Sequence, residues 1–181
     1  LLDWLTAKFT GEDQWSLKKL HKRILLSATY QQASLHREEA AAVDPENKLL
    51  WHFQRRRLEG EAVRDSMLAV SGLLNEKMGG PGVFPPLPDG ATVKGYALWK
   101  TTPEAADANR RSVYIFVRRN LRYPMFQSFD MPDTHESCAR RQETVTPDQA
   151  LELMNGRLIQ EWAAAFAKRV ENDRGLDTRA K

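Results

Sequence analysis

The stretch RLEGEAVRDSMLAVSGLLN, residues 57–75, decides the fold class. Its apolar side chains recur at the spacing of an α-helix and form one stripe, which comprises Leu58, Ala62, Val63, Met67, Val70, Leu73 and Leu74. Such a stripe predicts an amphipathic helix over about residues 57–75 that packs on a core. On the polar side, Glu61 follows Arg57 by four residues and precedes Arg64 by three. That spacing predicts ion pairs along the helix itself.

The carboxylates of this helix carry a second expectation. Glu61 and Asp65 border the apolar stripe, so we expect them to face inward, toward arginines from other segments of the chain. A carboxylate in such a place stabilises the fold only when it is paired. Glu61, Arg64 and Asp65 are therefore the residues for which the sequence predicts structural ion pairs.

Two shorter helices are predicted before this stretch. Apolar residues at helical spacing indicate the first over about residues 1–10, with Gly11 as its stop signal. The second is predicted to begin at Ser16, because a serine hydroxyl can accept a backbone N–H of the first helical turn.

The last helical region has the clearest start. Thr146 and Gln149 have the spacing of a capping box, and Pro147 lies between them at the first helical position. A break is predicted at Asn155-Gly156, after which the apolar period continues to Val170. Residues 171–181 lose this period, so we expect a frayed tail.

The part between these helical regions is irregular. Residues 79–90 hold four of the nine prolines and four of the ten glycines, which excludes a helix or a central strand. Residues 112–117, SVYIFV, are the best candidate for a strand because they are rich in β-branched and aromatic side chains, although the arginines on both sides leave a short helix as the alternative.

These patterns together predict a mainly α, irregular helical domain over residues 1–170, with a Pro/Gly-rich loop and at most one short β element. The expected core residues are Trp4, Leu20, Ile24, Leu58, Met67, Leu151, Trp162 and Phe166.

Composition excludes several classes of protein without selecting an activity. The 181 residues are 41% hydrophobic and 28% charged, with a net charge of +3, which is typical of a globular domain. The apolar runs are too short for a membrane-spanning helix. A single cysteine cannot form an internal disulfide, and the four histidines are scattered, so no metal site is predicted.

The arginines form the most informative charge pattern. Residues 108–129 contain five arginines and no acidic residue, and Arg140 and Arg141 follow closely. Guanidinium groups bind carboxylate, phosphate and sulfate in a forked geometry, so the candidate anion-binding residues are Arg118, Arg119, Arg140 and Arg141. The alternative is that these arginines tie the irregular segment to Asp130, Asp133, Glu136 and the acids of the helix predicted over residues 57–75, in partly buried ion pairs, and donate to backbone carbonyls.

Two further groups have weaker chemical signals. Asp130, His135 and Cys138 are candidates for acid–base or thiolate chemistry, although we expect Cys138 to be a structural, slowly reacting thiol packed as a small apolar residue. Residues 55–57 are three arginines beside aromatic residues, a mixture found on nucleic-acid surfaces. Acidic residues follow at once, so nucleic-acid binding is not expected.

Several ordered motifs resemble one known family, the planctomycete-specific domain one, a domain of unknown function. The similarity covers nearly the whole chain. The motifs that carry it are SLKKLH (16–21), SATYQ (27–31), DPENKLLW (44–51), RRRLEGEAVRDSMLA (55–69), RRSVY (110–114), RRN (118–120), FDMPD (129–133), SCARR (137–141) and TVTPDQAL (144–151).

The resemblance implies that this chain is the C-terminal part of a large protein exported to the periplasm or the cell surface. It implies that other domains of the parent protein precede it and that a c-type haem domain, where present, lies outside these residues. No cofactor is therefore expected in this chain. The family brings no established activity.

Three functions remain as hypotheses. The chain is a structural or interaction module, or an enzyme or enzyme half acting on an anionic or carbohydrate-like substrate, or an accessory that docks a cytochrome domain. The expected partners are the preceding domains of the parent chain and, for the second hypothesis, an anionic polysaccharide.

Overall fold

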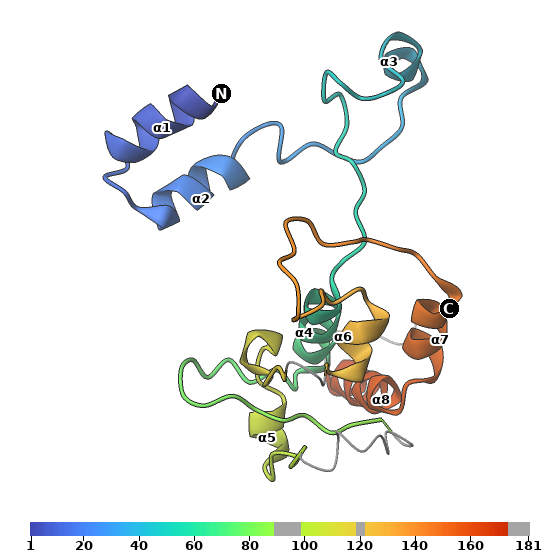
Figure 1. The fold of residues 1–181 in the computed structure, drawn as a ribbon. Helices are drawn as coiled ribbons and strands as arrows, with labels where there is room; N and C mark the ends of the chain where they lie inside the picture. The colour runs from blue at the N-terminus through green and yellow to red at the C-terminus, as the bar shows by residue number, and fades with distance from the viewer. Residues whose placement is uncertain (89–98, 119–121, 174–181) are drawn as a thin grey trace. The chain divides into compact units, whose positions relative to one another are not determined.

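The computed structural model describes residues 1–88, 99–118 and 122–173. Within these ranges the chain forms eight α-helices and no sheet, which confirms the predicted mainly α fold class. The chain folds as two compact units, Leu1–Arg56 and Arg57 onward, and Figure 1 shows the helices of both. The boundary falls at the start of the stretch that decides the fold class.

The first unit contains three short helices: α1 (Leu2–Thr10), α2 (Leu17–Leu25) and α3 (Glu38–Val43). Gly11 follows the last residue of α1, as predicted. Ser16 caps α2 by accepting the backbone N–H of the third helical residue at 3.4 Å, which confirms the predicted start.

Polar contacts hold the turns of the first unit. Arg23 of α2 donates to both carboxylate oxygens of Asp13, at 3.2 and 2.8 Å. Asp44 accepts the backbone N–H groups of Lys48 and Leu49 at 3.0 and 2.7 Å. Asp13 and Asp44 are the only buried residues in positions 1–56. This unit therefore has no buried apolar core of its own.

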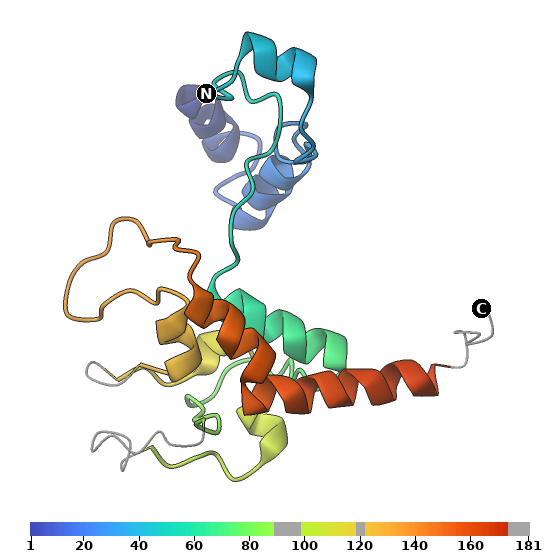
Figure 2. The ribbon, with the colours of Figure 1, turned by 90° about the vertical axis from the view of Figure 1, so that its right-hand side faces the viewer.

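The second unit contains five helices and a 3-10 turn. They are α4 (Gly60–Ser71), α5 (Ala105–Ala108), the turn Ser112–Tyr114, α6 (Pro124–Ser128), α7 (Pro147–Asn155) and α8 (Arg157–Asn172). The most extensive contact between two helices joins α4 to α8, which lie side by side in both views (Figures 1 and 2). α6 and the 3-10 turn also pack on α4. α4 is thus the central element of this unit.

The helix α4 is shorter than the predicted 57–75. It ends at Gly72, which adopts a left-handed conformation with φ of +76° and returns its N–H to the carbonyl oxygens of Leu68 and Ala69. Arg57 precedes the helix, and its side chain pairs with Asp130. The predicted ion pair between Arg57 and Glu61 is therefore wrong.

The break between α7 and α8 lies where the sequence predicts it. The capping box of Thr146 and Gln149 begins α7, which confirms the predicted start. At Gly156, a Cβ atom would lie 2.6 Å from the carbonyl oxygen of Glu152, so no larger residue fits there without a shift of the backbone. The next helix reaches Asn172, and residues 174–181 of the predicted tail lie outside the described residues.

The irregular segment has almost no regular pairing. Residues 79–88 contain no helix, as predicted. Of the two alternatives for residues 112–117, the strand is not formed and a short 3-10 helix is present. The first three of these residues form the 3-10 turn. Beyond them, Ile115 pairs with Val83 in a parallel bridge. Val83 donates to Tyr114 O at 2.8 Å and accepts from Phe116 N at 2.9 Å.

The core of the second unit is built from helices and from irregular segments in nearly equal parts. Its buried apolar residues are Leu68, Val83, Trp99, Ala108, Ile115, Tyr123, Met125, Phe126, Phe129, Ile159 and Trp162. Of the predicted core residues, Trp162 is buried, and Leu20 and Met67 are half-buried. The others are exposed by 40 to 57%, and their assignment was wrong: Trp4, Ile24, Leu58, Leu151 and Phe166. A search for helical periodicity cannot find core residues such as Val83, Trp99 and Ile115, because they lie outside the helices.

Gly60 tests the packing of α4 on α6. A Cβ atom there would lie 2.9 Å from Cβ of Phe129 and 3.3 Å from Cα of Phe126. We predict that Gly60→Ala lowers the free energy of unfolding by about 1–3 kcal/mol, although alanine ordinarily favours a helix. The exposed control Ser66→Ala, on the same helix, should raise it slightly. Chemical denaturation gives both values, and a more stable Gly60→Ala variant would contradict the close packing.

Candidate functional site

Arg64 is the most deeply buried charged residue of the described chain, with no exposed surface. It lies on α4, and its guanidinium donates to three groups of the segment 108–112. Nη2 donates to Ala108 O at 2.8 Å, and Nη1 donates to Arg110 O at 2.9 Å and to Ser112 Oγ at 3.2 Å. The Nε atom is buried and has no hydrogen-bond partner among the described residues.

The carboxylate nearest to Arg64 is largely engaged elsewhere. Asp65 Oδ1 lies 3.6 Å from Arg64 Nη1, beyond hydrogen-bond distance. The same oxygen accepts both the N–H and the Oγ–H of Ser112, at 2.8 and 2.6 Å. Burial lowers the pKa of Arg64 from its usual value, and the attraction of Tyr123 and Asp65 opposes this only in part. Both terminal nitrogens of the guanidinium thus donate hydrogen bonds, but its positive charge is weakly neutralised.

Arg110 extends this network into the glycine-rich loop, residues 77–82. Its guanidinium lies 3.8 Å from the ring centre of Tyr114 and donates to the carbonyl oxygens of Lys77, Gly79 and Pro81. Arg110 is therefore buried and fixes the loop through its backbone carbonyls. This is the structural role predicted from the sequence as the alternative to an anion site.

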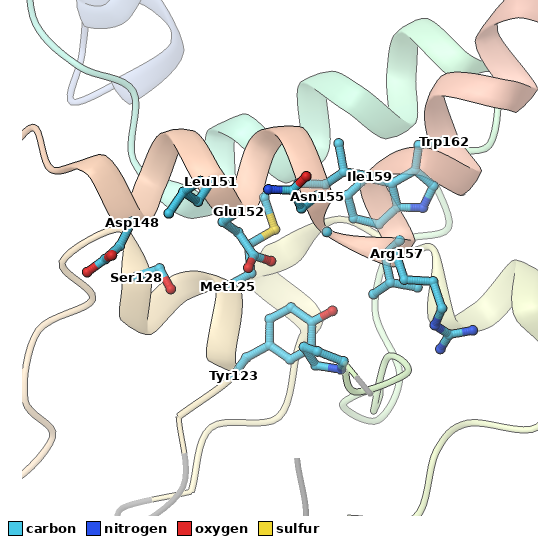
Figure 3. Close-up of a pocket in the computed structure, with 13 residues that line it drawn as sticks. Tyr123, Met125, Ser128, Asp148, Leu151, Glu152, Asn155, Arg157, Ile159 and Trp162 are labelled. Carbon is cyan, nitrogen blue, oxygen red and sulfur yellow. The ribbon is translucent and has the colours of Figure 1, made fainter. Parts of the chain in front are cut away.

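A cavity of the second unit lies between α6, α7 and α8 and has a volume of about 500 Å³ (Figure 3). Its apolar wall includes Met125, Ile159 and Trp162, and its polar wall includes Glu152 and Asn155. Figure 3 shows the polar side chains projecting from α7 and the ring of Tyr123 on the opposite side. The break at Gly156 gives the cavity its shape, because it separates the two helices that form one wall.

Tyr123 is the group of this cavity with the most strongly altered proton affinity. Burial raises the pKa of Tyr123 to about 12, and the positive charge of Arg64 offsets part of that rise. The hydroxyl therefore keeps its proton at neutral pH and donates to Pro86 O at 3.2 Å. It serves as a hydrogen-bond donor and cannot serve as a base.

The lining of this cavity suits the binding of a small polar molecule. Carboxylate, amide and hydroxyl groups stand beside apolar side chains, a combination that recognises a small polar molecule. Its described lining contains no histidine, cysteine or lysine. Sequence reasoning missed this cavity, because its residues come from three segments and carry no local motif.

The four predicted anion-binding arginines lie in different settings. Arg141 forms a forked ion pair with Glu61, at 3.2 and 2.9 Å, and lies 3.3 Å from Glu59. Arg118 is half-buried and Arg140 is exposed, whereas Arg119 lies outside the described residues. Glu61 therefore contacts an arginine of a distant segment, as predicted for a carboxylate that faces inward.

The predicted acid–base group is not assembled as one site. Asp130 binds Arg57 at 2.6 Å and accepts the N–H and the Oγ–H of Thr144, both at 2.8 Å. His135 is exposed. Asp130 thus anchors the loop between α6 and α7 and is not an unpaired carboxylate.

Cys138 differs from the expectation that it packs as a small apolar residue. It is exposed, and its thiol contacts the carbonyl oxygen of Arg140 at 3.3 Å. The apolar character of cysteine predicts a buried side chain, but the loop that carries Cys138 is held by the ion pairs of Arg57, Asp130 and Arg141 and not by packing on a core.

The described residues contain no group of three or more histidine, cysteine, aspartate or glutamate side chains placed to hold a metal ion. None of the helices in residues 1–88, 99–118 and 122–173 is both long and apolar enough to cross a membrane.

Comparison with known proteins gave one finding. The family model PSD1, described as a protein of unknown function (DUF1553), matches residues 1–180. No curated protein and no solved structure matches the chain significantly.

The anchor of the loop at Asp130 should depend on pH. Burial alone raises the pKa of Asp130, but hydrogen bonds from Thr144 and the charge of Arg57 outweigh it and hold the pKa below its ordinary value. The contribution of Asp130 to stability is therefore complete above the ordinary carboxyl pKa of about 4 and is lost as the pH falls through the lower, folded-state value.

We predict that Asp130→Asn lowers the thermal midpoint at pH 7 and that its difference from the wild type shrinks toward pH 2.5–3. Glu143→Gln, an exposed change in the same loop, is the control and should leave the midpoint unchanged at both pH values. A difference that stays constant with pH would mean that the charge of Asp130 does not hold the loop.

Proposed function

This chain belongs to the PSD1 family, whose function is unknown, and on that premise we propose that it is an interaction module of an exported multidomain protein. In this proposal the first unit, Leu1–Arg56, docks onto the preceding domains of the parent protein. The surface that it requires there is apolar and bordered by carboxylates.

The observation that carries this proposal is the missing core of the first unit. Positions 1–56 bury no apolar side chain, although helices of this length are stable only when an apolar face is covered. Large apolar side chains are instead exposed over both long helices of the unit, and they are Leu1, Leu2, Trp4, Trp15, Leu17, Ile24, Leu25 and Leu26. Exposed apolar surface of this extent marks an interaction site.

The charges of α2 indicate the chemistry of the partner. Lys19 contacts the carbonyl oxygen of Glu12 at 3.5 Å, and Arg23 is paired with Asp13, so these two basic residues serve the unit itself. Lys18 and Lys22 lie on another side of the helix, where they border a shallow hollow.

Leu25 and Leu26 form the apolar part of that hollow, and its lining contains no acidic residue. Apolar contact supplies most of the affinity in such an interface, whereas complementary charge sets its orientation and its rate of formation. An apolar partner surface with acidic residues at its border complements both the leucines of the hollow and the lysines beside them.

The enzyme hypothesis has less support. An enzyme would need an acid–base pair close to its anion-binding group. Asp130 and Arg141 are both occupied by structural ion pairs, with Arg57 and Glu61. The arginine segment thus lacks two of the groups that a catalytic site there would use, which favours the interaction module.

The test measures binding between this chain and the separately purified preceding domains of its parent protein. We predict a saturable complex in isothermal titration calorimetry. Leu25→Glu should weaken it by at least about tenfold, because the change places a carboxylate on the apolar contact beside the acidic border of the partner. Leu25 is 47% exposed, so the variant should remain folded.

Val43→Glu is the matched control, since Val43 is 81% exposed on α3 of the same unit and does not line the hollow. It should bind like the wild type. Absence of a complex with the wild type, or equal weakening by both variants, would reject the proposed docking surface. Circular dichroism of each variant verifies its helix content.

A further inference from the structure

We propose that a second, smaller cavity beside Arg64 binds a monoanionic carboxylic acid with a small apolar body. In this complex the carboxylate accepts a hydrogen bond from Nε–H of Arg64. The site is distinct from the docking surface of the first unit, and the proposal does not depend on that function.

The cavity has a volume of about 260 Å³. Its wall is mostly apolar and includes Leu73, Pro85, Leu158 and Trp162. Arg64 belongs to the same wall, so an apolar space and a guanidinium meet at one place. Sites for small molecules have this composition, in which apolar walls surround one or two polar groups that fix orientation.

The Nε–H of Arg64 is a donor that a ligand could use. Three of the five N–H groups of the guanidinium donate to Ala108, Arg110 and Ser112, whereas Nε is buried without a partner among the described residues. A buried donor without an acceptor costs free energy. An acceptor from a ligand removes that cost, and a charged acceptor forms the stronger bond.

The balance of charge around the cavity favours one negative charge. Asp65 is the only carboxylate paired with Arg64 within the described residues, at 3.6 Å, and it also lies 3.9 Å from the positive charge of Arg111. One other acid, Glu161, lines the cavity, and it is paired with Arg157 at 3.1 Å. One ligand carboxylate is therefore attracted, whereas a second one would approach Glu161.

The size of the cavity limits the apolar body to a small ring or a short branched chain. A volume of about 260 Å³ is below the usual range for sites of drug-sized ligands, and long acids would have to extend out of it. We therefore choose benzoate as the probe and its neutral analogue benzamide as the comparison.

The experiment titrates the whole chain with benzoate and follows the arginine Nε–H signals by ¹⁵N nuclear magnetic resonance. We expect one buried Nε–H signal to shift and saturate with benzoate, and benzamide to bind at least about tenfold more weakly. The signal belongs to Arg64 if it is missing from Arg64→Lys. Equal affinity for benzoate and benzamide would contradict the role of the charge.

A pair of variants tests the place of binding without a change at Arg64. Ala105→Trp puts a large ring at an exposed position that lines the cavity, so it should reduce benzoate binding by at least about tenfold. Ala106→Trp, at the neighbouring exposed residue outside the lining, should bind like the wild type. No saturable shift in the wild type, or equal binding by both variants, would overturn the proposal.

Discussion

The second unit depends on the buried guanidinium of Arg64. It joins the central helix α4 to the segment 108–112, which has no sheet or long helix to hold it. That segment carries Arg110, whose side chain in turn holds the carbonyl oxygens of the glycine-rich loop. The loop leads to Val83 and its bridge with Ile115, both of which belong to the core. A network of polar groups thus places irregular segments that contribute Val83 and Ile115 to the core.

The parts of the fold that the sequence predicts well have a local cause. Ser16 and Thr146 each satisfy backbone groups within one helical turn, and Gly156 breaks a helix at its own position. The residues that decide such features are neighbours in the sequence, so a short pattern contains the whole interaction. The core was predicted poorly because Val83, Trp99 and Ile115 lie outside the helices, and because α6, which buries Met125 and Phe126, is only five residues long and too short to show a helical period.

The charged residues show the same limit. The sequence places Arg57 near Glu61, yet Arg57 binds Asp130 and Glu61 binds Arg141, partners separated by 73 and 80 positions. A count of charges along a segment cannot detect such pairs, because they form only after the loop between α6 and α7 folds back onto α4. The apolar stripe was enough to predict that Glu61 faces inward. It was not enough to predict that its partner is Arg141.

The most direct test of this account is the free energy of unfolding of Arg64→Met, a variant of similar length without the guanidinium. The account predicts a loss of about 3 kcal/mol or more, because three buried acceptors lose their donor at once. The control is Arg111→Met, whose side chain is 59% exposed, and it should change stability by less than about 1 kcal/mol. An Arg64→Met chain as stable as the wild type would contradict the central role of this residue.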